Sequence, residues 1–249
     1  MKVFSVAGYH RTGKTTVVVN LIKELKSRGH KVVSIKDIHN DDFTMEKEGS
    51  NSWKHWQASD DVVIARGLNE TYQIWHRKLS LNEMLEHLSA DFVVVEGMKS
   101  APIPKIICAE NREQLDELVD GTVFAVSGKF ADSEKEYKDL PVLNSKQDIK
   151  KLTDLVEQKV FEVLPLSEPE CCMECGFTCT EMVAQILMGN KNRDDCKTDR
   201  KTEINLKIDG KEVKIVPFVQ KTLKDIILAY LQNLKGYEKG KKIEIIIND

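Results

Sequence analysis

The chain has no long hydrophobic run. No stretch approaches the roughly 20 apolar residues that a membrane helix needs. The apolar run that follows Met1 and Lys2 gives way within a few residues to the polar loop that begins at Gly8. That run is too short for the apolar core of a signal peptide. We therefore expect a cytoplasmic protein that does not cross a membrane.

The chain also has no excess of positive charge. Its formal net charge is -3, although 31% of its 249 residues are charged. This balance gives no reason to expect nucleic acid or an anionic membrane as a partner. Hydrophobic residues make up 41%, which is ordinary for a soluble folded protein. The length allows one large domain, or a standard domain with a small appendage.

Strand-like and helix-like stretches alternate through the first 165 residues. Apolar runs predict strands at 2–7, 31–35, 92–95, 105–108 and 122–126. Apolar periodicity and the capping box of Ser80 and Glu83 predict helices at 14–28, 80–88 and 145–163. Two further strands, 61–65 and 71–75, are separated by a turn around Gly67 and Asn69. This alternation is typical of an α/β fold with a mostly parallel sheet and helices on both faces.

The C-terminal third has a different pattern. Residues 164–170 contain two prolines and predict a linker, and a cysteine-rich segment with a short helix at 181–188 follows. Two strands flank Asp209-Gly210, a strong hairpin signal. An amphipathic helix at 222–234 and a last strand at 242–247 come after them. The sequence thus predicts three parts: residues 1–165, a cysteine-rich part at 171–200, and a small ββαβ module at 202–249.

The strongest motif lies between the first strand and the first helix. Gly8 to Thr15 fits G-x-x-x-x-G-K-[ST] in the strand-to-helix context that a P-loop requires. Glycines allow backbone N–H groups and the helix N-terminus to face phosphates. Lys14 would place its charge near the β- and γ-phosphates, and the Thr15 hydroxyl would ligate Mg²⁺. The alternative is a glycine-rich turn with an exposed lysine, but the context favours a site for a purine nucleoside triphosphate.

Three residues outside the loop could complete this site. Glu96 ends an apolar strand, where a carboxylate could orient water or hold the metal's water shell; the alternative is an ordinary solvated glutamate. Asp37 and His39 follow the second strand, at the edge where such sheets place ligand contacts. The predicted nucleotide contacts are Gly8, His10, Arg11, Thr12, Gly13, Lys14, Thr15, Thr16, Asp37 and His39.

The base preference does not follow from spacing. Asn144 to Asp148 superficially resembles the N-K-x-D guanine signature, in which the aspartate pairs with guanine N–H groups. The asparagine lies one residue too far away, and a helix cap is the better interpretation of residues 145–148. Spacing therefore does not choose GTP over ATP.

Five of the six cysteines fall in one short span. Cys172, Cys175, Cys179 and Cys196 supply four thiolates, with Cys171 as a spare that could replace Cys172. Soft thiolates suit zinc or an iron–sulfur cluster. Zinc ribbons usually carry two C-x-x-C pairs, whereas three close cysteines with a distant fourth favour a 4Fe-4S cluster. Zinc stays the alternative metal for these thiolates.

These motifs together resemble the molybdopterin-guanine dinucleotide biosynthesis protein B (MobB) family. The resemblance is close over residues 2–110 and rests on Gly13-Lys14-Thr15-Thr16, on Ile35-Lys36-Asp37-Ile38-His39, on residues 46–52, and on Val95-Glu96-Gly97-Met98-Lys99 with Pro104-Lys105-Ile106. The cysteine-bearing tail is similar to iron–sulfur extensions of some archaeal-type members. The resemblance implies a P-loop fold, a GTP preference, and Glu96 beside the γ-phosphate.

The resemblance also implies a function. The chain would be a dimer-forming GTP-binding adaptor with at most slow GTPase activity, because no triad or arginine finger can be named. It would assist the MobA-type nucleotidyltransferase that joins GMP to molybdopterin, for molybdenum or tungsten enzymes, and would meet their maturation factors. A rival function is nucleotide-driven insertion of a metallocentre or iron–sulfur cluster, or electron delivery. A third is nucleotide binding with a purely structural metal site.

Overall fold

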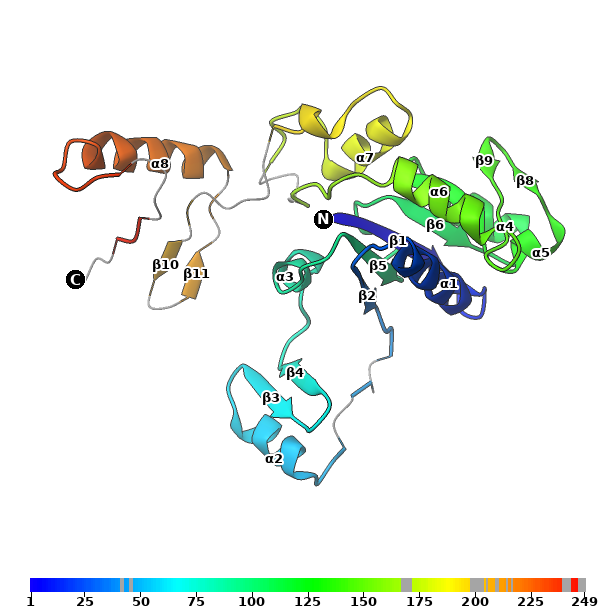
Figure 1. The fold of residues 1–249 in the computed structure, drawn as a ribbon, viewed down its shortest axis with the longest axis horizontal. Helices are drawn as coiled ribbons and strands as arrows, with labels where there is room; N and C mark the ends of the chain where they lie inside the picture. Colours follow the sequence, from blue (N-terminus) through cyan, green and yellow to red (C-terminus); the bar gives the residue numbers. More distant parts are fainter. Residues whose placement is uncertain are drawn as a thin grey trace.

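The computed structural model describes residues 1–40, 43–44, 47–166, 172–197, 204, 206–208, 211–213, 215, 217–238 and 243–245. Its centre is one parallel sheet with the strand order β2-β5-β1-β6-β7 (Figure 1). The strands are β1 (Lys2–Gly8), β2 (Val32–Lys36), β5 (Phe92–Glu96), β6 (Lys105–Cys108) and β7 (Val123–Ser127). Because β1 is central, the loop that follows it has a neighbouring strand on each side. The predicted parallel α/β fold is confirmed.

Helices cover both faces of the sheet. They are α1 (Lys14–Ser27), α3 (Leu81–Glu86), α4 (Arg112–Leu118), α5 (Phe130–Ser133) and α6 (Ile149–Lys159). On one face, Phe4 and Val6 of β1 pack with buried residues of α1 and α6. On the other face, Val3 packs with Leu85 of α3, and Ala7 packs with Leu115 of α4. The sheet is therefore buried on both sides, which explains why its strands are continuous apolar runs.

A second small sheet stands apart from the first. The strands β3 (Val62–Arg66) and β4 (Thr71–Trp75) form the predicted antiparallel hairpin, and its turn is closed by a hydrogen bond from Gly67 N–H to the Glu70 carbonyl. Helix α2 (Asn51–Ala58), which was not predicted, begins at a Ser50 cap and packs against this hairpin. Figure 1 shows this α2–β3–β4 unit below the five-stranded sheet, joined to it by two long connections.

Several element boundaries differ from the sequence prediction. Helix α6 begins at Ile149, four residues later than expected, because the Asn144 side chain accepts from the N–H groups of Lys146 and Gln147 and closes a turn there. It ends at Lys159, and Val160 is extended. Four elements were not predicted in this part: the helices α4 and α5, and the two-residue strands β8 (Glu136–Tyr137) and β9 (Leu140–Pro141), which pair with each other.

The cysteine-rich segment packs on the amino-terminal edge of the sheet. Helix α7 (Cys179–Leu187) begins at a capping box of Thr178 and Glu181, two residues earlier than predicted, and ends before Gly189. Met182 and Val183 are buried against Leu164. A short 3-10 helix, η1 (Arg193–Asp195), follows. Arg193 Nε donates to the Glu162 carbonyl at 2.9 Å, beside the start of β1.

The C-terminal part contains the predicted hairpin and helix. Strands β10 (Leu206–Ile208) and β11 (Lys211–Val213) pair antiparallel, while their turn, Asp209-Gly210, lies outside the described residues. Helix α8 (Pro217–Leu231) begins five residues before the prediction, since proline is well suited to a first helical position. The last strand was predicted at 242–247, and of these residues the described 243–245 lie in no strand.

Candidate functional site: a phosphate loop at the carboxyl edge of the sheet

The P-loop backbone turns tightly at the end of the central strand. Gly8 has φ 149°, and a Cβ placed there would lie 2.0 Å from the carbonyl oxygen of Cys108 on β6. Gly13 has φ 96° and immediately precedes α1. Both glycines therefore allow a backbone that a side chain would disturb. The loop delivers the N-terminus of α1, and its N–H groups, to the carboxyl edge of the sheet.

The loop after β7 supports the P-loop from the other side. Lys129 N–H donates to the Thr12 carbonyl at 3.0 Å. Gly128 has φ 75°, and a Cβ there would lie 2.3 Å from the same Thr12 oxygen. Thr12 is buried, and its hydroxyl donates to the Tyr9 carbonyl at 2.9 Å. The sequence did not predict this contact between the two loops. The only local signal for it was Gly128, which directly follows the buried strand β7.

Two predicted ligands meet beside the P-loop. The Thr15 hydroxyl donates to Glu96 Oε1 at 2.8 Å, and Glu96 is only 9% exposed at the end of β5. Lys36, at the end of β2, places Nζ 3.2 Å from the same oxygen. Lys14 turns back over the loop, so that its ammonium donates to the Tyr9 carbonyl. The Thr15 hydroxyl and the Lys36 ammonium thus meet at the Glu96 carboxylate. Such a combination of oxygen ligands and positive charge suits Mg²⁺ and phosphate.

Asp37 and His39 lie next to Glu96. Asp37 N–H donates to the Glu96 carbonyl at 2.9 Å, and His39 Nε2 lies 3.0 Å from Asp37 Oδ2. A Cβ at Gly97 would lie 3.0 Å from Asp37 Cβ, so the residue that follows β5 must be small here. His39 itself is largely exposed, with 76% of its side chain accessible. The predicted second-strand residues therefore share the edge with the P-loop, beside β5.

The other predicted contacts are exposed on the loop and on α1. His10 and Arg11 are at the loop's outer turn, where Arg11 has φ 61°, and Thr16 lies one residue beyond Thr15. Cys108 lies under the loop and is fully buried, which raises the pKa of its thiol to about 12. Its thiolate is therefore inaccessible as a ligand or nucleophile.

The stretch predicted as a helix cap is built differently. Asp148 occupies the position before α6, yet its side chain makes no capping hydrogen bond. Its carboxylate instead lies 3.4 Å from Asn144 N–H and 3.6 Å from Lys151 Nζ. The turn is closed instead by the side chain of Asn144, which lies one residue before the predicted cap and accepts from the Lys146 N–H. The prediction of a cap at 145–148 was thus right about a local hydrogen-bonded turn and wrong about its residue.

The cysteines of the cysteine-rich segment lie away from the P-loop, in and around α7 and η1, at the opposite edge of the sheet. Cys175, Cys179 and Cys196 pack around the small apolar cluster of Leu164, Met182 and Val183, and all three are half-buried. Cys175 Sγ lies 3.5 Å from the Phe177 carbonyl oxygen. Cys171 is outside the described residues. Across the part of the chain that the structure describes, no three His, Cys, Asp or Glu side chains are grouped to hold a metal ion.

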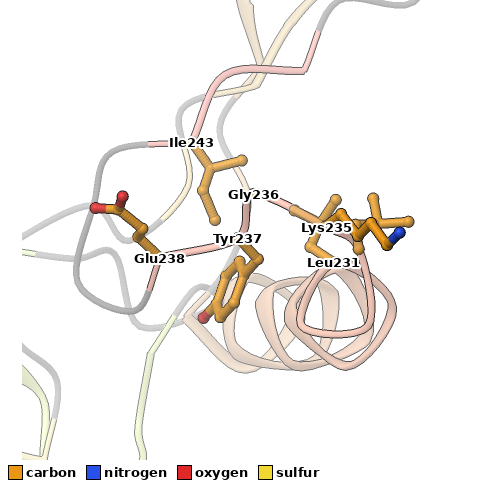
Figure 2. Close-up of a pocket in the computed structure, with 7 residues that line it drawn as sticks. Leu231, Lys235, Gly236, Tyr237, Glu238 and Ile243 are labelled. Atoms are coloured by element: carbon orange, nitrogen blue, oxygen red, sulfur yellow. The ribbon is translucent and has the colours of Figure 1, made fainter.

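A pocket of about 330 Å³ lies at the end of α8, away from all these residues. Figure 2 shows its lining by Leu231, Lys235, Gly236, Tyr237, Glu238 and Ile243. It contains none of the predicted site residues. Among the described residues, no helix is long and apolar enough to cross a membrane.

The fold and the loop define a class. A parallel α/β sheet with a P-loop on its central strand, and with a buried carboxylate on the adjacent strand facing the loop threonine, is the architecture of a P-loop nucleotide-binding protein. Residues 3–128 match the sequence profile of the family described as "Molybdopterin guanine dinucleotide synthesis protein B". The chain belongs to this MobB family.

Individual relatives agree with this assignment. A molybdopterin-guanine dinucleotide biosynthesis adapter protein of Haemophilus influenzae is 34% identical over half of this chain and 73% of its own. A Methanocaldococcus jannaschii protein, provisionally named as such an adapter, is 27% identical over all of this chain and 98% of its own. The crystal structure of Bacillus subtilis MobB matches with TM-score 0.54 and 22% identity, covering 66% of this chain and all of that one. The crystal structure therefore supports the parallel α/β fold, and about a third of this chain lies outside the match.

Proposed function

We propose that this chain is a GTP-binding adaptor that assists the attachment of GMP to molybdopterin. Family membership supports the pathway, and the Haemophilus influenzae relative is named as an adapter in it. The observation that carries nucleotide binding is the contact of 2.8 Å between Thr15 and the buried Glu96, next to the P-loop. In this arrangement Thr15 would ligate Mg²⁺, Lys14 would contact the terminal phosphates, and Glu96 would orient the metal's water shell.

Hydrolysis by the isolated chain should be slow. Thr15 and Glu96 can hold a metal, but among the described residues no arginine contacts Glu96 or Lys14 to stabilise the charge of a transition state. A nucleotide state that persists suits an adaptor that waits for a partner. The partner we propose is a MobA-type nucleotidyltransferase, together with maturation factors of the molybdoenzymes.

The test of nucleotide binding uses two lysines of the same helix. Lys14→Ala should weaken Mg²⁺-dependent GTP binding by at least about tenfold, because a charge-assisted contact with phosphate is lost. Lys23→Ala removes an exposed lysine of α1 and should leave the affinity unchanged. Titration of both variants and the parent with a fluorescent GTP analogue measures the difference. Equal affinity of parent and Lys14→Ala would refute the proposal.

We also propose a 4Fe-4S cluster on the cysteine-rich segment, with zinc as the alternative. The donor chemistry fits, because Cys175, Cys179 and Cys196 share one apolar cluster. Gly176 has φ 80°, and a Cβ placed there would meet no atom within 4 Å, so the backbone at this position is open. Cys172, Cys175, Cys179 and Cys196 would be the ligands. The described residues do not themselves group these side chains as ligands, so binding would draw them together.

Metal analysis tests this second proposal. Protein purified without oxygen should contain iron and acid-labile sulfide near four per chain. Cys175→Ser and Cys196→Ser should lower both, whereas Cys171→Ser, the matched change at the spare cysteine, should matter less. One zinc per chain in a colourless preparation would replace the cluster with a structural zinc site. Iron that transfers to an apoprotein would favour the rival function of cluster insertion.

We further propose that the chain forms a homodimer. The β3–β4 hairpin stands away from the main sheet (Figure 1). It exposes Ile64 on one face, Tyr72 on the other and Leu68 at its turn, apolar side chains that a second copy would cover. The three-part division at 1–165, 171–200 and 202–249 is likewise our proposal. Light scattering of the purified chain, and limited proteolysis between the parts, would check the two.

A further inference from the structure

The two sides of the P-loop have different chemistry. On the β5 side are Thr15, Glu96 and Lys36, the residues that suit Mg²⁺ and the terminal phosphates. Metal ions in such sites bridge the β- and γ-phosphates. If the terminal phosphates lie on this side, the α-phosphate and the nucleoside must extend toward the other side of β1, where β6 and β7 end. The base is therefore expected beside the loops that follow β7 and β9.

These two loops adjoin the P-loop and α1. The first, which begins at Gly128, is bonded to the P-loop through Lys129 N–H and the Thr12 carbonyl. The second contains Ser145, whose carbonyl accepts from the Asn20 amide of α1 at 3.1 Å. Asn20 lies about one turn beyond Thr16 on the same helix. The loops thus flank the path that a nucleoside would take from the phosphates.

One carboxylate lies between the two loops and is held in a fixed orientation. Asn144 Nδ2 donates to Asp132 Oδ1 at 2.7 Å. Asn144 is only 5% exposed, and its own Oδ1 is held by the N–H groups of Lys146 and Gln147. Asp132 is exposed, and its Oδ2 has no partner among the described residues. A buried amide therefore orients an exposed carboxylate whose second oxygen faces no other group of the described protein.

We propose that Asp132 recognises the guanine base, with Asn144 as its positioning residue. A carboxylate is an acceptor only, so it can accept from guanine N1–H and the 2-amino group together. Adenine presents an acceptor at N1 and lacks the 2-amino group, so the same carboxylate disfavours it. The inference rests on the proposed GTP-binding function and names the residue that would give it a guanine preference. Asp148 is the competing carboxylate, and it lies 3.6 Å from the ammonium of Lys151.

The test is a change of base specificity. In Asp132→Asn, an NH2 group replaces one of the two acceptor oxygens; it can donate to the 2-carbonyl of xanthine, but it opposes the 2-amino group of guanine, which is also a donor. We expect this variant to bind GTP about ten- to a hundredfold more weakly, the loss of one bidentate base contact, and to bind xanthosine triphosphate more tightly than the parent does. Asp148→Asn is the matched control and should keep the parental order of GTP, ATP and xanthosine triphosphate. Circular dichroism checks that both variants fold.

The outcomes separate this inference from the function on which it rests. A parent that binds no nucleotide, or binds GTP and ATP equally, would remove the proposed function or its guanine preference. A parent that prefers GTP, together with an unchanged Asp132→Asn, would overturn the role of Asp132 alone. A switch to xanthosine triphosphate in Asp148→Asn instead would assign the base to Asp148. Weakened GTP binding in Asp132→Asn with gained xanthosine triphosphate binding would establish the proposal.

Discussion

The two predicted sites lie at opposite edges of the same sheet and are built in different ways. At the carboxyl edge, glycine conformations and strand ends already bring Thr15 to within 2.8 Å of Glu96. At the amino-terminal edge, Cys175, Cys179 and Cys196 surround an apolar cluster without forming a ligand group among the described residues. A phosphate site made of backbone can be set by the fold alone, whereas thiolate ligands commonly depend on the metal for their final arrangement.

The largest effect expected from this comparison is at Gly8. Gly8→Ala would put a Cβ about 2.0 Å from the Cys108 carbonyl oxygen, so the loop must shift. We expect a loss of about 3 kcal/mol or more in the free energy of unfolding, together with weaker nucleotide binding. Gly189, just after α7, has φ 80°, but a Cβ placed there would meet no atom within 4 Å. Gly189→Ala should therefore cost about 1–2 kcal/mol, the ordinary penalty of left-handed backbone.

Urea denaturation of both variants measures these two losses. Similar losses at Gly8 and Gly189 would mean that the close approach of β1 and β6 at the P-loop adds nothing beyond backbone conformation, and the contrast between the two edges would fail.

A smaller effect is expected at the apolar cluster beneath the cysteines. Met182 is 1% exposed, and Met182→Ala should destabilise the packing of α7 by about 2–4 kcal/mol, because a cavity is left. Met188 follows the same helix as its C-cap residue and is 62% exposed, so Met188→Ala should cost less than about 0.5 kcal/mol. Hydrogen exchange of α7 amides would measure both changes. If Met182→Ala left exchange in α7 as slow as in the parent, the apolar cluster would not be what holds this segment in place.

The smallest effect concerns the helix caps of the two regions. In α3, Glu83 accepts from the N–H and hydroxyl of Ser80 and pairs with Arg77, which lowers its pKa to about 2. In α7, the N–H and hydroxyl of Thr178 lower the pKa of Glu181. A lowered folded-state pKa stabilises the protein above the unfolded value of about 4.5, and this contribution is lost as the pH falls toward the folded value.

Glu83→Gln should therefore be less stable than the parent at pH 7, by up to about 1 kcal/mol, and the difference should fade between about pH 4.5 and 2. Thermal unfolding followed across this range would show it, with the corresponding change Glu181→Gln expected to follow the same direction. A difference that grew on acidification would contradict the assigned cause.

The sequence by itself determined the parallel sheet, the P-loop and most of the first seven strands, because these depend on local signals. Apolar runs of buried strands, the glycines at positions 8 and 13, and the capping box of Ser80 are all visible along the chain. The same local signals placed Glu96, Asp37 and His39 at strand ends, and the parallel topology brought them together.

Only the tertiary structure decided which residues support and orient these groups. The bond from Lys129 N–H to Thr12 and the bond from Asn144 to Asp132 join segments that are 117 and 12 residues apart, a spacing that no local pattern reports. The start of α6 also depended on the Asn144 turn rather than on helical periodicity. Local patterns along the chain specified the P-loop motif, whereas the packing of distant segments decided that Lys129 supports this loop and that Asn144 orients Asp132.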